Sequence, residues 1–163
     1  MTGLAIYTVV HVAISLLGIG SGFVALFGLI SGRRLDGWTA FFLATTVATS
    51  VTGFGFPIHG FTPGLGLGVI SLVALALAIY ARYARRLAGG WRRVYVITAA
   101  VALYLNVFVL IVQSFQKVPF LKALAPTQSE WPFALAQLLA LAGFLVLGFL
   151  AVKRFRAEPV GAA

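Results

Sequence analysis

Long runs without a charged residue constrain the fold of this chain more than any other feature. Asp, Glu, Lys and Arg are absent from residues 4–31, 39–57, 65–81, 94–115 and 133–152. A helix needs about 20 apolar residues to cross a hydrocarbon layer about 30 Å thick. Charged residues make up 9% of the chain, against roughly 25% in a soluble domain. The sequence therefore predicts an all-α polytopic membrane protein, a five-helix bundle that forms a single transmembrane domain over residues 1–163.

The third run is the weakest of these candidate spans. Gly64, Gly66 and Gly68 stand at its start, and glycine has a low helix propensity. A re-entrant third segment, which would leave four spans, is the alternative. All 6 prolines lie at or beyond the ends of the runs, so we expect no helix to be interrupted by one.

The basic residues predict how the bundle is oriented. Of the 12 Lys and Arg residues, only Lys117 and Lys122 fall in the second or fourth loop, and the others fall in the first loop, the third loop and the tail. An excess of Lys and Arg marks cytoplasmic loops. We therefore expect the amino terminus outside and the carboxyl terminus in the cytoplasm, which requires an odd number of spans.

The same topology accounts for the net charge of +9, so we expect no nucleic-acid partner. The arginines of the third loop are predicted to contact anionic lipid headgroups or an acidic partner; these are Arg82, Arg85, Arg86, Arg92 and Arg93. The chain contains no cysteine, which excludes disulfides and Cys-ligated metal sites. It has no Ser-His-Asp arrangement, HExxH helix or phosphate loop, so we assign no catalytic residue and no metal ligand and expect no enzymatic activity.

Polar residues within the predicted spans are the candidates for a binding site, because such groups are costly in a membrane. His11, Asn106, Gln113 and Gln137 are predicted to reach the outer half of the bundle. The outer loops add four residues that would close the mouth of such a pocket: His59, Lys117, Gln128 and Glu130. The alternative is that these side chains only tie helices together by hydrogen bonds.

Small residues predict close packing of the first helix. Gly18 and Gly22 form a G-x-x-x-G pattern, which lets helix backbones approach each other in a membrane.

The end of the sequence resembles a family of small bacterial proteins predicted to lie in the inner membrane, to which no activity is assigned. The resemblance is carried by residues 91–96, 104–108, 113–119 and 125–133, with the sequences WRRVYV, YLNVF, QSFQKVP and APTQSEWPF. It implies a location in the bacterial inner (cytoplasmic) membrane and draws attention to the fourth loop.

Three functional hypotheses remain. The first is a non-catalytic membrane protein that acts as an accessory subunit, or that binds a lipophilic molecule such as a quinone or lipid in an outer-leaflet pocket. The second is a redox subunit that holds b-type haem through His11 and His59, since a six-coordinate haem takes two axial ligands. The third is a small transporter or channel. Expected partners are membrane lipid and a partner membrane protein or a second copy of the chain.

Overall fold

The computed structural model describes residues 2–57 and 59–156, and within them the chain is helical without strands. The helices are α1 (Gly3–Ile30), α2 (Asp36–Gly53), α3 (Pro63–Ile79), α4 (Trp91–Lys117), α5 (Pro119–Leu124) and α6 (Trp131–Arg154). The last turn of α3 continues as a π-helical segment, η1 (Tyr80–Ala84).

Local sequence explains where several helices begin. Thr2 and Thr62 cap α1 and α3, because each hydroxyl accepts a hydrogen bond from the backbone N–H three residues later. Prolines stand in the first turn of α3, α5 and α6, where the missing N–H costs no intrahelical bond. The prediction that no proline interrupts a helix is confirmed for the described residues.

Four helices are long and apolar enough to cross a membrane: Gly3–Ile30, Pro63–Ala84, Trp91–Lys117 and Trp131–Arg154. The third predicted span is therefore a continuous helix of 22 residues, and the re-entrant alternative is wrong. The helices outside this group are α5, which has 6 residues, and α2, which has 18 residues, starts at Asp36 and carries several threonines. The described chain is thus all-helical, and its four long apolar helices are typical of a multi-pass membrane protein.

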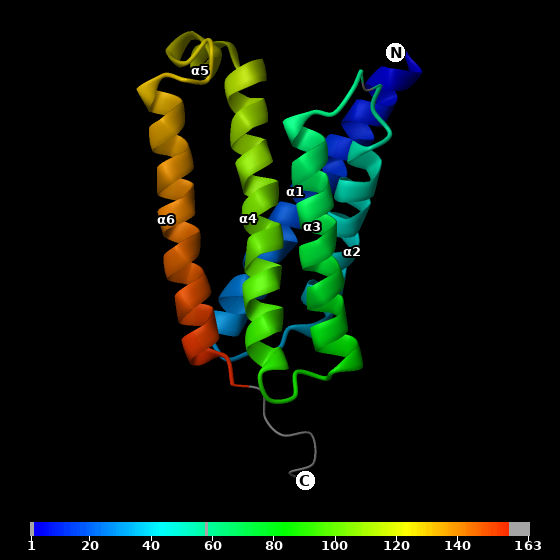
Figure 1. The fold of residues 1–163 in the computed structure, drawn as a ribbon, viewed down its shortest axis with the longest axis vertical. Helices are drawn as coiled ribbons and strands as arrows, with labels where there is room; N and C mark the ends of the chain where they lie inside the picture. Colours follow the sequence, from blue (N-terminus) through cyan, green and yellow to red (C-terminus); the bar gives the residue numbers. More distant parts are fainter. Residues whose placement is uncertain (1, 58, 157–163) are drawn as a thin grey trace.

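The long helices run along the bundle axis (Figure 1). In this view α6, α4 and α3 stand side by side, while α1 crosses obliquely behind them and α2 lies behind α3. The start of α1 and the end of α6 lie at opposite ends of the bundle. We call the end that carries the arginine-rich loops the basic end, and the other, where α5 lies across the tops of α4 and α6, the α5 end.

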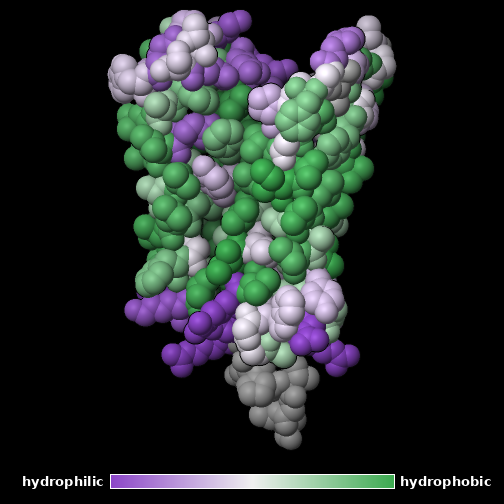
Figure 2. Space-filling model, viewed as in Figure 1, coloured by the Kyte–Doolittle hydropathy of each residue, from purple (hydrophilic) through white to green (hydrophobic). Residues whose placement is uncertain are grey.

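The surface is banded, with polar side chains at both ends and an apolar zone between them (Figure 2). The buried core, in contrast, is unevenly distributed. It is concentrated near the basic end, where Leu26, Phe42, Leu75, Val96 and Leu103 are each at most 3% exposed. Gly18 and Gly22 are also buried, as expected from the G-x-x-x-G pattern.

Candidate functional site

Toward the α5 end the bundle separates into two groups of helices. No residue of α1 before Gly18, of α4 between Leu103 and Phe115, or of α6 before Phe144 is buried. Figure 2 shows the molecule hollowed at this end, between the tops of α4 and α6 and the tops of α1 and α3. We call the two sides the α1–α3 group and the α4–α6 group, and the space between them the cleft.

Side-chain contacts beyond the core stay within one group or the other. On the first side, Tyr7 and His11 bond to Thr52, and the Ser50 hydroxyl donates to Ser71 at 3.1 Å. On the second side the contacts are Phe115 against Phe133, Gln137 to Phe108, and Gln128 to Val112. Among the described residues, no side-chain hydrogen bond or aromatic pair joins the two groups across the cleft at this depth.

The floor of the cleft lies where α1, α2 and α4 meet. A Cβ placed on Gly18 would lie 3.3 Å from the hydroxyl oxygens of Thr45 and Thr46 and 3.5 Å from Asn106 Nδ2. Thr46 Oγ1 and Asn106 Nδ2 are both buried and lack a hydrogen-bond partner among the described residues. A buried amide N–H left unpaired costs about 1–3 kcal/mol, so the floor retains a hydrogen-bonding capacity that the protein itself does not use.

One face of α4 forms a wall of the cleft above this floor. Gln113 lies two turns beyond Asn106, and Lys117 ends the helix another turn further on. Two turns bring a side chain back to the same helix face, about 10 Å along the axis. Gln113 is exposed, because α1 has already diverged from α4 at this level. The structure therefore places Asn106, Gln113 and Lys117 on a common face, in order of decreasing depth.

The opposite wall is built from α1 and the end of α2. The Tyr7 hydroxyl donates to the Thr52 carbonyl at 2.6 Å, and His11 Nδ1 lies 2.8 Å from Thr52 Oγ1. Phe56 packs edge-on against both rings at centroid distances of 5.0 Å. His11 is two turns beyond Gly18 and thus shares its face of α1. His11 and Gln113 therefore lie the same number of turns from the floor, on different helices.

The remaining candidates are held by local partners. Gln137 Nε2 donates to the Phe108 carbonyl at 3.3 Å, while its Oε1 is buried without a partner in the described chain. Gln128 Nε2 donates to the Val112 carbonyl at 2.9 Å, which ties the fourth loop to α4. Glu130 accepts hydrogen bonds from the Thr127 hydroxyl and from the backbone N–H groups of Thr127 and Ser129.

These hydrogen bonds lower the pKa of the Glu130 carboxyl group. Desolvation acts to raise its pKa, but the hydrogen bonds from Thr127 and Ser129 outweigh it and hold the pKa below its ordinary value of 4.5.

His59 is exposed in the loop after Pro57. No hydrogen bond or aromatic pair among the described residues joins His59 to His11, and the pairing of these two histidines as haem ligands stays a prediction.

A separate open pocket of about 180 Å³ lies at the α5 end, within the α4–α6 group. It is lined by Phe115, Gln116, Lys122, Pro126, Thr127 and Gln128. Among the predicted mouth residues, only Gln128 lines it.

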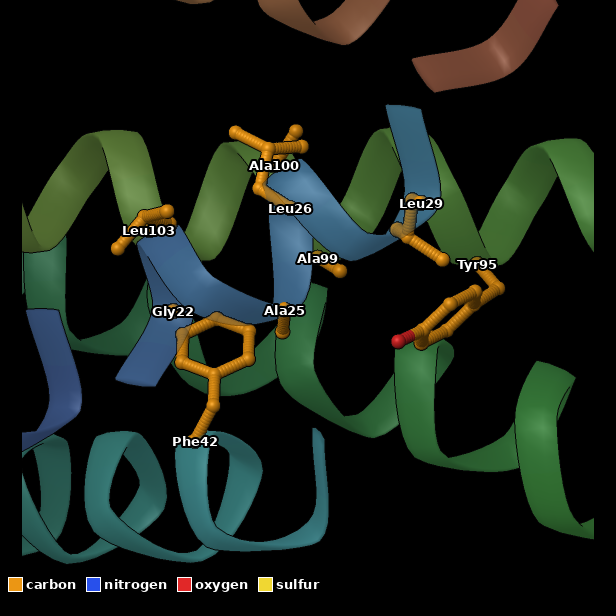
Figure 3. A pocket seen from close by; sticks show the side chains of 9 residues that line it. All are labelled: Gly22, Ala25, Leu26, Leu29, Phe42, Tyr95, Ala99, Ala100 and Leu103. Carbon is orange, nitrogen blue, oxygen red and sulfur yellow. The ribbon is translucent and has the colours of Figure 1, made fainter. Parts of the chain in front are cut away.

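The core offers no room for a ligand (Figure 3). A cavity of about 10 Å³ lies between α1, α2 and α4, and its lining is apolar except for the Tyr95 hydroxyl. A single water needs a comparable volume, together with several polar partners. This cavity is therefore too small for a ligand, and the transporter hypothesis stays a prediction.

Two of the five arginines predicted to contact lipid are used inside the protein. Arg82 is 3% exposed, pairs with Asp36 and lies 5.2 Å from the centre of the Tyr95 ring. Arg92 donates to the carbonyls of Val152 and Phe155 and so completes the end of α6. For Arg82 the prediction of headgroup contact is wrong, because η1 extends the helix and turns this side chain inward. Arg85, Arg86 and Arg93 are exposed at the basic end.

No protein-family model, curated protein or solved structure matches this chain.

The sequence alone missed Tyr7, Thr46 and Thr52. One signal was available, because Tyr7 and His11 are spaced i and i+4 and thus share a helix face. Thr46 carried no such signal, since its importance depends on the approach of α4.

Proposed function

We propose that the chain is a five-span protein of the bacterial inner membrane, with its amino terminus outside. Lys and Arg are more numerous at the basic end than at the α5 end. This difference supports the orientation, because an excess of Lys and Arg favours the cytoplasmic side. α2 supports the fifth span, since it runs along the bundle axis and buries Thr39, Phe42 and Leu43 against its neighbours. In this orientation the α5 end faces outward and the cleft opens in the outer leaflet.

The cleft binds a lipophilic small molecule, a quinone or a lipid, and the protein is not an enzyme. The observation that carries this proposal is the unpartnered amide nitrogen of Asn106 at the floor of the cleft. Binding sites for small molecules combine apolar walls with a few placed polar groups. Asn106 and Gln113 each provide N–H donors, which suit a carbonyl oxygen of a quinone or of a lipid ester.

The dimensions of the cleft fit such a ligand. Asn106 lies about 16 Å below Lys117 along the axis of α4, which is close to the depth of one leaflet's hydrocarbon. A ligand with its polar group at Gln113 or Asn106 would leave its apolar part between α1 and α4. His59, Lys117, Gln128 and Glu130 belong to the loops and helix ends beyond this space and would form its mouth.

The experiment compares ligand retention in two variants of α4. Native mass spectrometry of protein extracted in mild detergent should show a bound small molecule, and Gln113→Leu should reduce its occupancy at least several-fold. Ser114→Ala is the matched control, because Ser114 Oγ donates to the Leu110 carbonyl of its own helix. A folded Gln113→Leu protein that retains the ligand fully, and differs only in thermal stability, would contradict the proposal.

The same spectra address the accessory-subunit alternative. A second polypeptide that fills the cleft would co-purify with the chain and leave no small-molecule mass. That result would replace the ligand with a partner helix. A coloured preparation that loses its colour in His11→Ala would instead favour haem.

A further inference from the structure

The hydrogen bonds around Thr52 determine which nitrogen of His11 carries the proton. The Thr52 hydroxyl lies 2.7 Å from the Ala48 carbonyl and 3.2 Å from the Thr49 carbonyl of its own helix. A threonine hydroxyl within a helix donates its single proton to such a carbonyl. Thr52 Oγ1 can then only accept from His11 Nδ1, at 2.8 Å. His11 Nδ1 is therefore the donor of this pair, and its Nε2 is left unprotonated in the neutral ring.

The surroundings hold the ring in this position. Phe56 packs edge-on at 5.0 Å from the imidazole, and Tyr7, one turn away on α1, is itself bonded to the Thr52 carbonyl. A glycine leaves room for the Tyr7 side chain, because a Cβ on Gly55 would collide with the Tyr7 hydroxyl. A Cβ on Gly53 would lie in ordinary contact with the imidazole, 3.9 Å from His11 Cε1. The side chains of Tyr7, His11, Thr52 and Phe56 thus form a packed cluster at the end of α2.

His11 Nε2 has no hydrogen-bond partner within the described part of the chain and is not one of its buried polar atoms. It is therefore an accessible acceptor in a region that a bilayer would keep nearly free of water. The other polar groups of the cleft, at Asn106 and Gln113, bring N–H donors. The α1–α3 group thus offers an acceptor at His11, and α4 offers donors at Asn106 and Gln113.

We propose that His11, fixed as the Nδ1–H tautomer by Thr52, accepts a hydrogen bond from a hydroxyl group of the ligand through Nε2. This inference rests on the proposed function and narrows its ligand class. The cleft binds a hydroxyl-bearing lipophile, such as a quinol or another phenol, in preference to the corresponding molecule without a donor. A quinone offers only acceptors and leaves Nε2 unpaired, whereas a hydroxyl group of a quinol can donate to Nε2.

The tautomer can be measured directly, because the chain has only 2 histidines. In protein labelled with ¹⁵N-histidine, multiple-bond ¹H–¹⁵N correlation distinguishes Nδ1–H from Nε2–H, and His59→Gln assigns the two signals. We expect His11 to be Nδ1–H, and Thr52→Val to shift it toward Nε2–H. Thr49→Val is the control, because the Thr49 hydroxyl donates to Thr45 and makes no bond to His11. An Nε2–H tautomer in the unmodified protein would overturn the inference.

Ligand preference is tested with 4-nonylphenol and 4-nonylanisole, which differ by the hydroxyl proton and a methyl group. One neutral hydrogen bond corresponds to roughly 3- to 10-fold in affinity, and we expect that preference for the phenol in the unmodified protein. Both His11→Leu and Thr52→Val should abolish it. Equal binding of the two probes would overturn the acceptor role of His11 and leave the cleft in place. Failure of both probes to bind, with the Nδ1–H tautomer present, would overturn the proposed cleft itself.

Discussion

The guanidinium of Arg82 lies buried beneath the carboxylate of Asp36, which is itself exposed. The side chain of Arg82 is 2% exposed and that of Asp36 is 72% exposed. The pair joins η1 to the first turn of α2, at the point where α2 leaves the basic end. Arg82 Nη1 has no partner among the described residues. The hydrogen bond to Asp36 and the contact with the Tyr95 ring therefore offset most of the free-energy cost of burying the guanidinium.

Asp36→Asn should destabilise the protein because it leaves a buried guanidinium without a counter-ion. Hydrogen bonds to charged groups contribute about 1.5–3 kcal/mol, and the exposure of Asp36 places the expected loss near the lower end of that range. Thermal unfolding in detergent, followed by tryptophan fluorescence, measures it. Arg34→Gln is the control, since the Arg34–Asp36 pair is 3.7 Å apart and exposed. Equal shifts in the two variants would contradict this account.

Gly22→Ala should destabilise the contact between α1 and its neighbours. A Cβ at this position would lie 2.6 Å from Leu103 Cδ1 and 2.9 Å from the Phe42 ring, and such overpacking costs about 1–3 kcal/mol. Gly20→Ala is the matched control, because a Cβ there has nothing within 4 Å. It should be neutral or slightly stabilising, since alanine is the better helix former. Equal stability of Gly22→Ala and Gly20→Ala would contradict the predicted overpacking.

Arg92→Gln should loosen the last turn of α6. Its guanidinium donates to the carbonyls of Val152 and Phe155, which have no intrahelical partner at a helix end. We expect a loss of about 1–2 kcal/mol and faster amide exchange in residues 151–155. Hydrogen exchange read by mass spectrometry would detect this change. Arg93→Gln, one residue along and exposed, should leave the exchange of this segment unaltered.

Single cysteines in the cysteine-free chain test whether α2 crosses the membrane. Ser31→Cys and Phe61→Cys flank α2 on either side, and both native side chains are exposed. With five spans, a membrane-impermeant maleimide added to intact cells should label Phe61→Cys and spare Ser31→Cys. Labelling of both positions, or of neither, would place the two loops on one side and exclude a fifth span.

Glu130 should make stability depend on pH in the acidic range. Its folded pKa lies below the ordinary value of 4.5, so its stabilising contribution is complete above that value and is lost as the pH falls through the folded pKa. The unmodified protein should therefore be more stable than Glu130→Gln at neutral pH, with the difference vanishing in acid. Thr127→Val, which removes one hydrogen bond to the carboxylate, should reduce the difference. A difference that grows on acidification would show that the sign is wrong.

The helices were largely predictable from the sequence, because burial in lipid requires long uncharged runs. Pro132 stands in the first turn of α6, at the start of the last predicted span, whereas α3 begins at Pro63, ahead of the predicted start at residue 65. The position of Arg82 was not predictable in the same way. A span that is predicted to end before the first charged residue leaves Arg82 in a loop. The residue that allows Arg82 to be buried is Asp36, which is 46 residues away in the sequence.

The candidate site was predicted less well, since hydropathy does not fix the order in which helices pack. Asn106 and Gln113 could be placed on one face of α4 by spacing alone. The partner of Gln137, in contrast, is a backbone carbonyl of another helix, at Phe108. A carbonyl carries no sequence signature, so whether Gln137 lines a site or ties two helices depends on the neighbour that it meets.

The separation of the two helix groups also determines what fills the space between them. Between α1 and α4, beyond Gly18 and Asn106, the protein supplies too few side chains to fill the space. Acyl chains would therefore act as packing material in this layer, much as core residues do near the basic end. Lipid chain length and unsaturation in one leaflet should then set the spacing between the groups, while the arginine-rich half keeps its shape in any bilayer.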